Sequence, residues 1–194
     1  DKYNVSVPRY TSYPPANFFR PFTGEEYLKE VDYSNEVREK NLSFYFHMPF
    51  CRRLCHYCGC NSYPMAKEER VAEYVQALHK EIDLVAAHLD KSRRISQIHY
   101  GGGSPTAMPV SVLKELNEHL LSLFSTIEQP EIAIECHPGY LTGKDWKGLL
   151  DARFNRFSLG IQDFNEDVLR LVNRTPSELP TEEIVAILRS AGVS

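Results

Sequence analysis

The chain has 194 residues, of which 42% are hydrophobic and 11% aromatic, enough to build one packed globular core. Its net charge is −4 at pH 7, with 22 Lys and Arg against 26 Asp and Glu and no basic run, so no nucleic-acid or anionic-membrane partner is expected. No apolar stretch reaches the roughly 20 residues of a membrane helix, and the N-terminus has no signal-peptide core, so we expect a cytoplasmic protein.

Residues 1–41 are expected to form an N-terminal arm. Prolines interrupt regular structure through much of it, at Pro8, Pro14, Pro15 and Pro21. One short helix is predicted to start at Thr23, because the Thr23 hydroxyl and the Glu26 carboxylate match a capping box.

Residues 42–194 alternate between short β-branched or aromatic runs and amphipathic helical stretches. Strands are predicted at 42–47, 95–100, 131–136 and 156–161. Helices are predicted over 71–89, from Pro109 to about Phe124, around Trp146, around Leu169, and from the cap Thr181 to about Ser190. This alternation predicts an α/β fold with a parallel sheet and right-handed crossovers. Four strands do not close a barrel, and the chain stops where a further strand should begin, so we expect a β/α barrel truncated before closure.

Unusual residues occur where each predicted strand ends. They are Cys51, the glycines Gly101 to Gly103, Glu135 and Gln162. Functional sites in parallel β/α folds lie beyond the carboxyl ends of the strands, so we expect these residues to share one site.

The first of these segments contains four of the five cysteines. Cys51, Cys55 and Cys58 follow a C-x3-C-x2-C spacing, and closely clustered thiolates favour an iron–sulfur cluster. The alternative is structural zinc, held by four cysteines or with His47 or His56, although such zinc sites usually combine two cysteine pairs that are distant in sequence.

The remaining cysteines, Cys60 and Cys136, are expected to be small buried residues rather than ligands. With three thiolate ligands, one iron keeps an open position for a substrate or cofactor, as in catalytic metal sites.

Polar residues at the other strand ends favour a ligand as well. Three consecutive glycines let the backbone approach a ligand closely, although the segment matches neither a phosphate loop nor a dinucleotide fingerprint. Glu135 is placed to bind ribose hydroxyls or an ammonium group, with a solvated strand end as the alternative. For Gln162 and Arg174 the alternatives are an amide that caps a loop and an ion pair on a helix.

Several motifs resemble those of a known family. The segment HMPFCRRLCHYC resembles the cluster loop of the radical S-adenosylmethionine enzymes, and HYGGGSPT resembles their cofactor-binding glycine segment. Together with PRYTSYPP at 8–15, the CGC sequence, and NRFSLGIQDFNEDVLRLVNR at 155–174, they make the chain similar, over about residues 9–192, to the N-terminal portion of oxygen-independent coproporphyrinogen III dehydrogenases, also called oxidases.

This resemblance implies a partial (β/α) barrel of the radical S-adenosylmethionine type, with a 4Fe–4S cluster on Cys51, Cys55 and Cys58. It implies S-adenosylmethionine contacts from Tyr45, Tyr57, Gly102, Gly103, Ser104, Glu135, Gln162 and Arg174. The implied reaction is oxidative decarboxylation of two propionate side chains of coproporphyrinogen III, in porphyrin and haem biosynthesis. A 5′-deoxyadenosyl radical abstracts the hydrogen, and a separate donor supplies the electron. The implied full-length protein is a monomer, and this portion alone is expected to be inactive.

Two departures from the family pattern concern the cofactor pocket. His137 follows Cys136 where the family usually has an acidic residue, and Ser104 replaces a threonine.

Haem chaperones are a competing interpretation. They share the cluster loop, but they typically have an aromatic residue in place of Cys60 and lack the proline-rich arm. A zinc-stabilised interaction module explains the thiols only.

Overall fold

The computed structural model describes residues 16–36 and 41–193. The segment PRYTSYPP therefore lies outside the described residues. The predicted helix of the arm is α1 (Gly24–Ser34), which follows a 3-10 turn, η1 (Ala16–Phe18). Its predicted capping box is confirmed, because the Glu26 amide donates to Thr23 Oγ1 at 3.1 Å and the Thr23 amide donates to Glu26 Oε2 at 2.9 Å.

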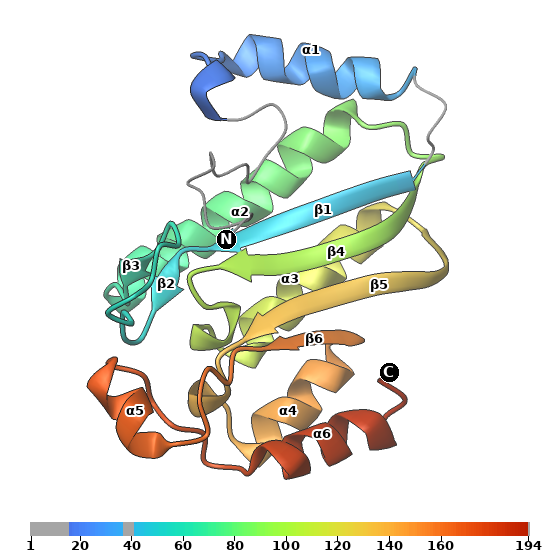
Figure 1. Cartoon of the computed structure of the whole chain (residues 1–194). Coiled ribbons are helices and arrows are strands. Elements are labelled where there is room, and N and C mark those ends of the chain that lie inside the picture. The colour runs from blue at the N-terminus through green and yellow to red at the C-terminus, as the bar shows by residue number, and fades with distance from the viewer. Residues whose placement is uncertain (1–15, 37–40, 194) are drawn as a thin grey trace, which may run out of the picture.

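The sheet has four parallel strands in the order β1 (Asn41–Met48), β4 (Arg94–Gly102), β5 (Thr126–Cys136) and β6 (Arg156–Leu159) (Figure 1). The predicted α/β fold with four parallel strands is confirmed. The last strand ends at Leu159 instead of Ile161, because the Ile161 amide turns back to donate to the Leu159 carbonyl at 3.0 Å instead of pairing with β5.

A second, small sheet was not predicted. It pairs the two-residue strands β2 (Phe50–Cys51) and β3 (Tyr63–Pro64), which lie at the two ends of the segment that carries the cysteines. This pairing closes that segment into a loop beyond the carboxyl end of β1.

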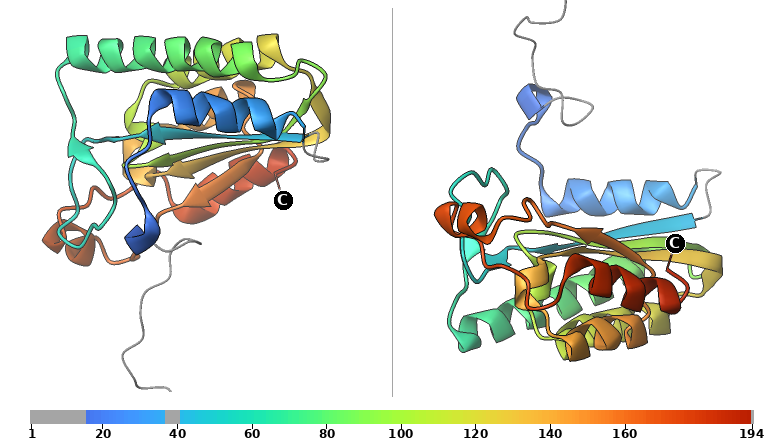
Figure 2. Two further views of the ribbon diagram at one scale, coloured as in Figure 1. Left: turned by 90° about the horizontal axis from the view of Figure 1, so that it is seen from above. Right: turned by 60° about the horizontal axis from the view of Figure 1, so that its bottom comes forward.

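Helices α2 (Glu68–His88), α3 (Val110–Leu123) and α4 (Gly143–Asp151) cover one face of the sheet, and α6 (Thr181–Ser190) packs beside α4 (Figures 1 and 2). Thr181 is not the cap that was predicted. Pro180 occupies the N-cap position, its extended ψ of 145° ends the preceding loop, and Thr181 is already the first helical residue. Pro109 likewise precedes α3 as its N-cap.

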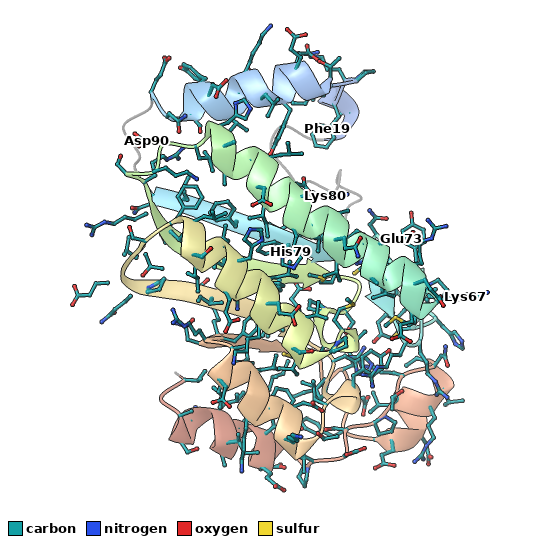
Figure 3. The ribbon with its side chains drawn as sticks, turned by 180° about the vertical axis from the view of Figure 1, so that it is seen from behind. Phe19, Lys67, Glu73, His79, Lys80 and Asp90 are labelled. Carbon is teal, nitrogen blue, oxygen red and sulfur yellow. The ribbon has the colours of Figure 1, made fainter. Side chains whose placement is uncertain are left out.

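The core lies between the sheet and these helices. Its most deeply buried side chains come from β1, β4, α3 and α4: Met48, Ile95, Ile98, Tyr100, Leu113, Leu116, Trp146 and Leu149. Burial of such apolar side chains is the main favourable contribution to folding. On the outer side, His79 lies between α2 and α3 (Figure 3), where its Nδ1 is 2.7 Å from that of His119.

The opposite face of the sheet, here called the open face, has no helix over it in the described part of the chain (Figure 2). Alternate residues of the strands point to this face, and most of them carry polar groups, among them Tyr45, Gln97, His99, Glu131, Glu135 and Arg156. None of the helices over residues 16–36 and 41–193 has the length and hydropathy that crossing a bilayer requires.

Candidate metal and cofactor site

A pocket of about 420 Å³ lies at the carboxyl ends of the four strands. Every site residue predicted from the sequence except Tyr45 lines it: Cys51, Cys55, Tyr57, Cys58, Gly102, Gly103, Ser104, Glu135, Gln162 and Arg174. A larger groove of about 580 Å³ lies among α1, β1 and α2, but none of the cysteines lines it. The chemistry of the lining, rather than the volume, therefore identifies the candidate site.

Cys51 to Cys60, here called the cysteine loop, leave β2 and run beside α5 (Glu166–Leu171) (Figure 1). The His56 amide donates to the Val172 carbonyl at 3.1 Å, and Asn173 Nδ2 donates to the Leu54 carbonyl at 2.9 Å. These bonds join segments more than 100 residues apart in sequence. The loop is therefore fixed by the chain that follows β6.

The thiols of the loop differ in their surroundings. Cys51 is buried, and burial raises the pKa of its thiol, whereas Cys58 is exposed. A hydrogen bond from the Cys60 backbone lowers the pKa of Cys58, and hydrogen bonding to Cys58 raises the pKa of Cys60. Cys60 is exposed, not buried as predicted, and Cys136 is buried at the end of β5 as predicted.

Arg174 is buried, with 8% of its surface exposed, and reaches the cysteine loop from the chain beyond α5. Its Nη1 donates to Cys55 Sγ at 3.4 Å and its Nη2 donates to the Gly160 carbonyl. Arg174 is therefore not part of an ion pair on a helix, which was the alternative. A guanidinium in this position stabilises negative charge on sulfur.

The glycine segment forms the wall of the pocket next to the thiols. Gly102 has a backbone φ of +112°, a conformation that residues with a side chain rarely adopt. A Cβ at this position would lie 2.7 Å from His47 Cε1. At Gly103 a Cβ would lie 2.8 Å from the Pro49 carbonyl oxygen. The glycines are therefore required for the close approach of β4 to the start of the cysteine loop.

Glu135 is on the open face, opposite in direction to Ile132 and Ile134, as its position in the strand predicted. Its Oε1 accepts from His99 Nε2 at 3.3 Å, and His99 stacks on Tyr45 with ring centroids 5.8 Å apart. Tyr45 does not line the pocket but lies next to the carboxylate that does. The carboxylate is thus held at the pocket by a row of side chains from three strands.

Gln162 lies in the loop after β6 with a φ of +69° and an exposed side chain. His47 is unsuited to the zinc alternative, because both its ring nitrogens are engaged, one with the Tyr45 hydroxyl at 3.1 Å and the other with the Asn61 carbonyl at 2.9 Å. These contacts leave neither nitrogen free to bind a metal.

His137 also lines the pocket, with 7% of its surface exposed. Neither ring nitrogen has a hydrogen-bond partner. Burial, followed by the positive charge of Arg174, lowers its pKa from 6.5 to about 4, so the imidazole is neutral at physiological pH.

Three residues of the site were not predicted from the sequence as functional. The sequence did contain a signal for His99. It alternates in β4 with Ile98 and Tyr100, which are buried, so its side chain points to the open face, as those of Tyr45 and Glu135 do. His137 was noted only as a departure from the family pattern. For Tyr140 no sequence signal was available, because its contacts depend on how the turn after β5 meets the cysteine loop.

The donor set fits an iron–sulfur cluster. Three cysteine sulfurs and the Arg174 guanidinium line the same wall of the pocket, and the glycine backbone lies beside them. In residues 16–36 and 41–193, no three His, Cys, Asp or Glu side chains are grouped so as to hold a single metal ion. A cluster does not need such a point of convergence, because each thiolate binds a different iron atom.

Residues 45–194 match the Radical SAM superfamily. The chain belongs to this superfamily. Over 192 residues it is 36% identical to an oxygen-independent coproporphyrinogen III oxidase of Synechocystis, and over 191 residues 40% identical to that of Escherichia coli K12. Each alignment covers 98% of this chain, and 41% and 40% of the two relatives.

The solved structure of the Escherichia coli coproporphyrinogen III oxidase superposes on this radical SAM chain with a TM-score of 0.81 and 35% identity. The match covers 95% of this chain and 42% of that one. The chain thus spans about two fifths of the length of these relatives, and corresponds to their N-terminal part.

Proposed function

We propose that this radical SAM chain is the N-terminal part of an oxygen-independent coproporphyrinogen III oxidase, or dehydrogenase. The proposed reaction is oxidative decarboxylation of two propionate side chains of coproporphyrinogen III to give protoporphyrinogen IX. One observation carries the proposal: all the residues implied as cluster ligands or cofactor contacts, except Tyr45, line one pocket, in a chain similar to such oxidases over 98% of its length.

Cys51, Cys55 and Cys58 would hold the 4Fe–4S cluster, and Arg174 would offset the charge of its thiolates. When bound, the cluster and S-adenosylmethionine supply the radical that takes hydrogen from the substrate, once an external one-electron donor has reduced the cluster. Glu135 provides a carboxylate for the ammonium or ribose groups of the cofactor, and His99 orients that carboxylate. The Gly102 to Ser104 backbone leaves room for the cofactor beside the thiols.

The alternatives have less support. A zinc site that uses His47 is disfavoured because both ring nitrogens of His47 are engaged in other bonds, and a zinc module of four cysteines leaves the glycines, Glu135 and Gln162 of the same pocket without a role. A haem chaperone does not explain Cys60 in the cysteine loop or the oxidase names of the relatives reported above.

The test is anaerobic reconstitution of the chain, followed by measurement of iron and acid-labile sulfide per chain and of 5′-deoxyadenosine formed from S-adenosylmethionine and dithionite. A variant with Cys51, Cys55 and Cys58 all changed to Ala is the matched control. We expect four irons per chain and cofactor cleavage in the wild type alone. Zinc in place of iron, in chain isolated without oxygen, would refute the proposal.

A further inference from the structure

Tyr140 joins the turn after β5 to the middle of the cysteine loop. Its hydroxyl accepts a hydrogen bond from the Arg53 amide at 2.9 Å and donates to the Arg53 carbonyl at 3.3 Å. Arg53 lies midway between Cys51 and Cys55, and Tyr140 is 87 residues further along the chain. A single side-chain hydroxyl thus satisfies both backbone polar groups of the residue between two proposed ligands.

The Tyr140 ring is held in turn by its neighbours. It stacks on His137, with ring centroids 3.9 Å apart and ring planes 8° apart. The Arg52 guanidinium lies 5.1 Å from the ring centroid, and Arg52 Nη1 donates to the Tyr140 carbonyl at 3.4 Å. Only 6% of the Tyr140 surface is exposed, so its hydroxyl is held in place by burial and stacking.

The position of Tyr140 follows from the turn η3 (Pro138–Tyr140), which begins two residues after β5 ends. Glu135 is at the end of that strand, on the cofactor side of the pocket. The turn therefore connects the strand that presents the cofactor carboxylate with the segment that presents the thiols. Within residues 16–36 and 41–193, Tyr140 is the side chain that hydrogen-bonds to the Arg53 backbone.

We propose that Tyr140 is a positioning residue for the iron–sulfur cluster. Its hydroxyl fixes the Arg53 peptide and thereby the relative placement of Cys51 and Cys55 before the cluster binds. The inference rests on the proposed function, because the cysteine loop has a ligand to position only if it holds a cluster. It goes beyond that function because it assigns a positioning role to a residue that lies outside the sequence motifs.

The alternative role of Tyr140 is that of a buried aromatic residue, and Tyr140→Phe separates the two. Phe keeps the ring, the stacking on His137 and the contact with Arg52, and it removes only the hydroxyl. Tyr33→Phe is the matched control, because Tyr33 is on α1 with 59% of its surface exposed.

The first measurement is hydrogen exchange of peptides that cover residues 52–55 in the chain before the cluster is added. We expect about five- to tenfold faster exchange in Tyr140→Phe, with exchange in α2 unchanged, because only the two hydrogen bonds to the loop are lost. The second is the rate at which an iron chelator removes the cluster from the reconstituted chain, which we expect to rise by a similar factor. Tyr33→Phe should match the wild type in both.

Equal chelation rates in the wild type and Tyr140→Phe would overturn the inference and leave the proposed function standing. Unchanged exchange at 52–55 would overturn it as well. A wild-type chain that assembles no cluster would overturn the proposed function and this inference together. Thermal unfolding of each variant without the cluster distinguishes faster loss of the cluster through the loop from faster loss through a destabilised fold.

Discussion

The cysteine loop contains one more thiol than the proposed cluster needs. Cys51, Cys55 and Cys58 are expected to be the ligands, so changing any one of them to Ala should abolish the cluster. Cys60→Ala should retain it, because three thiolates leave the open iron that cofactor binding requires. The measurement is iron per chain after anaerobic reconstitution. Loss of the cluster in Cys60→Ala, together with its retention in one of the other three variants, would contradict this ligand set.

Glu135 is the carboxylate expected to bind the cofactor. Glu135→Ala should weaken S-adenosylmethionine binding to the reconstituted chain by roughly 1 to 3 kcal/mol, because a charged hydrogen-bond partner is removed. Glu131→Ala is a matched control: Glu131 is on the same face of the same strand but pairs with Gln97 and Arg156 instead of lining the pocket. Calorimetry on both variants decides the matter, and unchanged affinity in Glu135→Ala would leave Glu135 a solvated strand end.

His137 makes stability depend on pH in a predictable direction. Its pKa is about 4 in the folded chain and 6.5 in the unfolded reference, so between these values the unfolded state binds more protons. The stability that the chain has with His137 neutral is fully present above pH 6.5, and it is lost progressively as the pH falls toward 4. We expect His137 to lower the free energy of unfolding by about 2 kcal/mol between pH 7 and pH 5.

The test of this dependence is His137→Phe, which keeps a ring to stack on Tyr140 and cannot take up a proton. Urea unfolding at pH 7 and pH 5 should show a smaller loss of stability in the variant than in the wild type. The same loss in both proteins would show that other groups control the acid sensitivity.

At the scale of the elements, the strands and helices follow from local patterns, and so their positions were predictable. The short strands β2 and β3 were not, because two-residue pairings have no periodicity and depend on the path of the cysteine loop. The helix caps were likewise predicted only in part. Thr23 was identified correctly by its partner Glu26, whereas Thr181 was misassigned because the preceding Pro180 takes the cap position.

The helix caps allow a direct comparison. Thr142 caps α4 through a box with Asp145, and α4 carries the buried Trp146 and Leu149. Thr142→Ala should lower the free energy of unfolding by about 1 kcal/mol. Thr181→Ala should change it by less than about 0.5 kcal/mol, since no cap bond is lost. Denaturant unfolding of both variants checks the difference, and equal losses would mean that Thr181 contributes to its helix after all.

At the scale of the whole molecule, the sequence predicted which residues meet at the strand ends, because parallel strands bring their carboxyl ends to one edge. It could not predict how the site is held together. The bonds from Arg174 to Cys55 and from Tyr140 to Arg53 join residues 119 and 87 positions apart, and their geometry depends on the packed fold.

The sheet also determines what the 194-residue chain is expected to do by itself. Its open face leaves Tyr45 59% exposed beside the cofactor carboxylate, and β6 is an edge strand in the described residues. Radical chemistry requires that water and competing groups be excluded from the reacting carbon. The proposed ligands and cofactor contacts, in contrast, all lie within the pocket or next to it. Binding of the cluster and cofactor should therefore be separable from conversion of the substrate.

We accordingly expect the reconstituted 194-residue chain to form 5′-deoxyadenosine from S-adenosylmethionine without converting coproporphyrinogen III. The assay follows 5′-deoxyadenosine and protoporphyrinogen IX together, without oxygen and with dithionite as the electron source. The full-length Escherichia coli relative, assayed under the same conditions, is the positive control for the substrate and the reductant. Cofactor cleavage uncoupled from decarboxylation fits a cofactor pocket whose open face is still accessible to solvent. Sustained formation of protoporphyrinogen IX would mean instead that these 194 residues already exclude water from the reacting carbon, and that the open face is covered during the reaction.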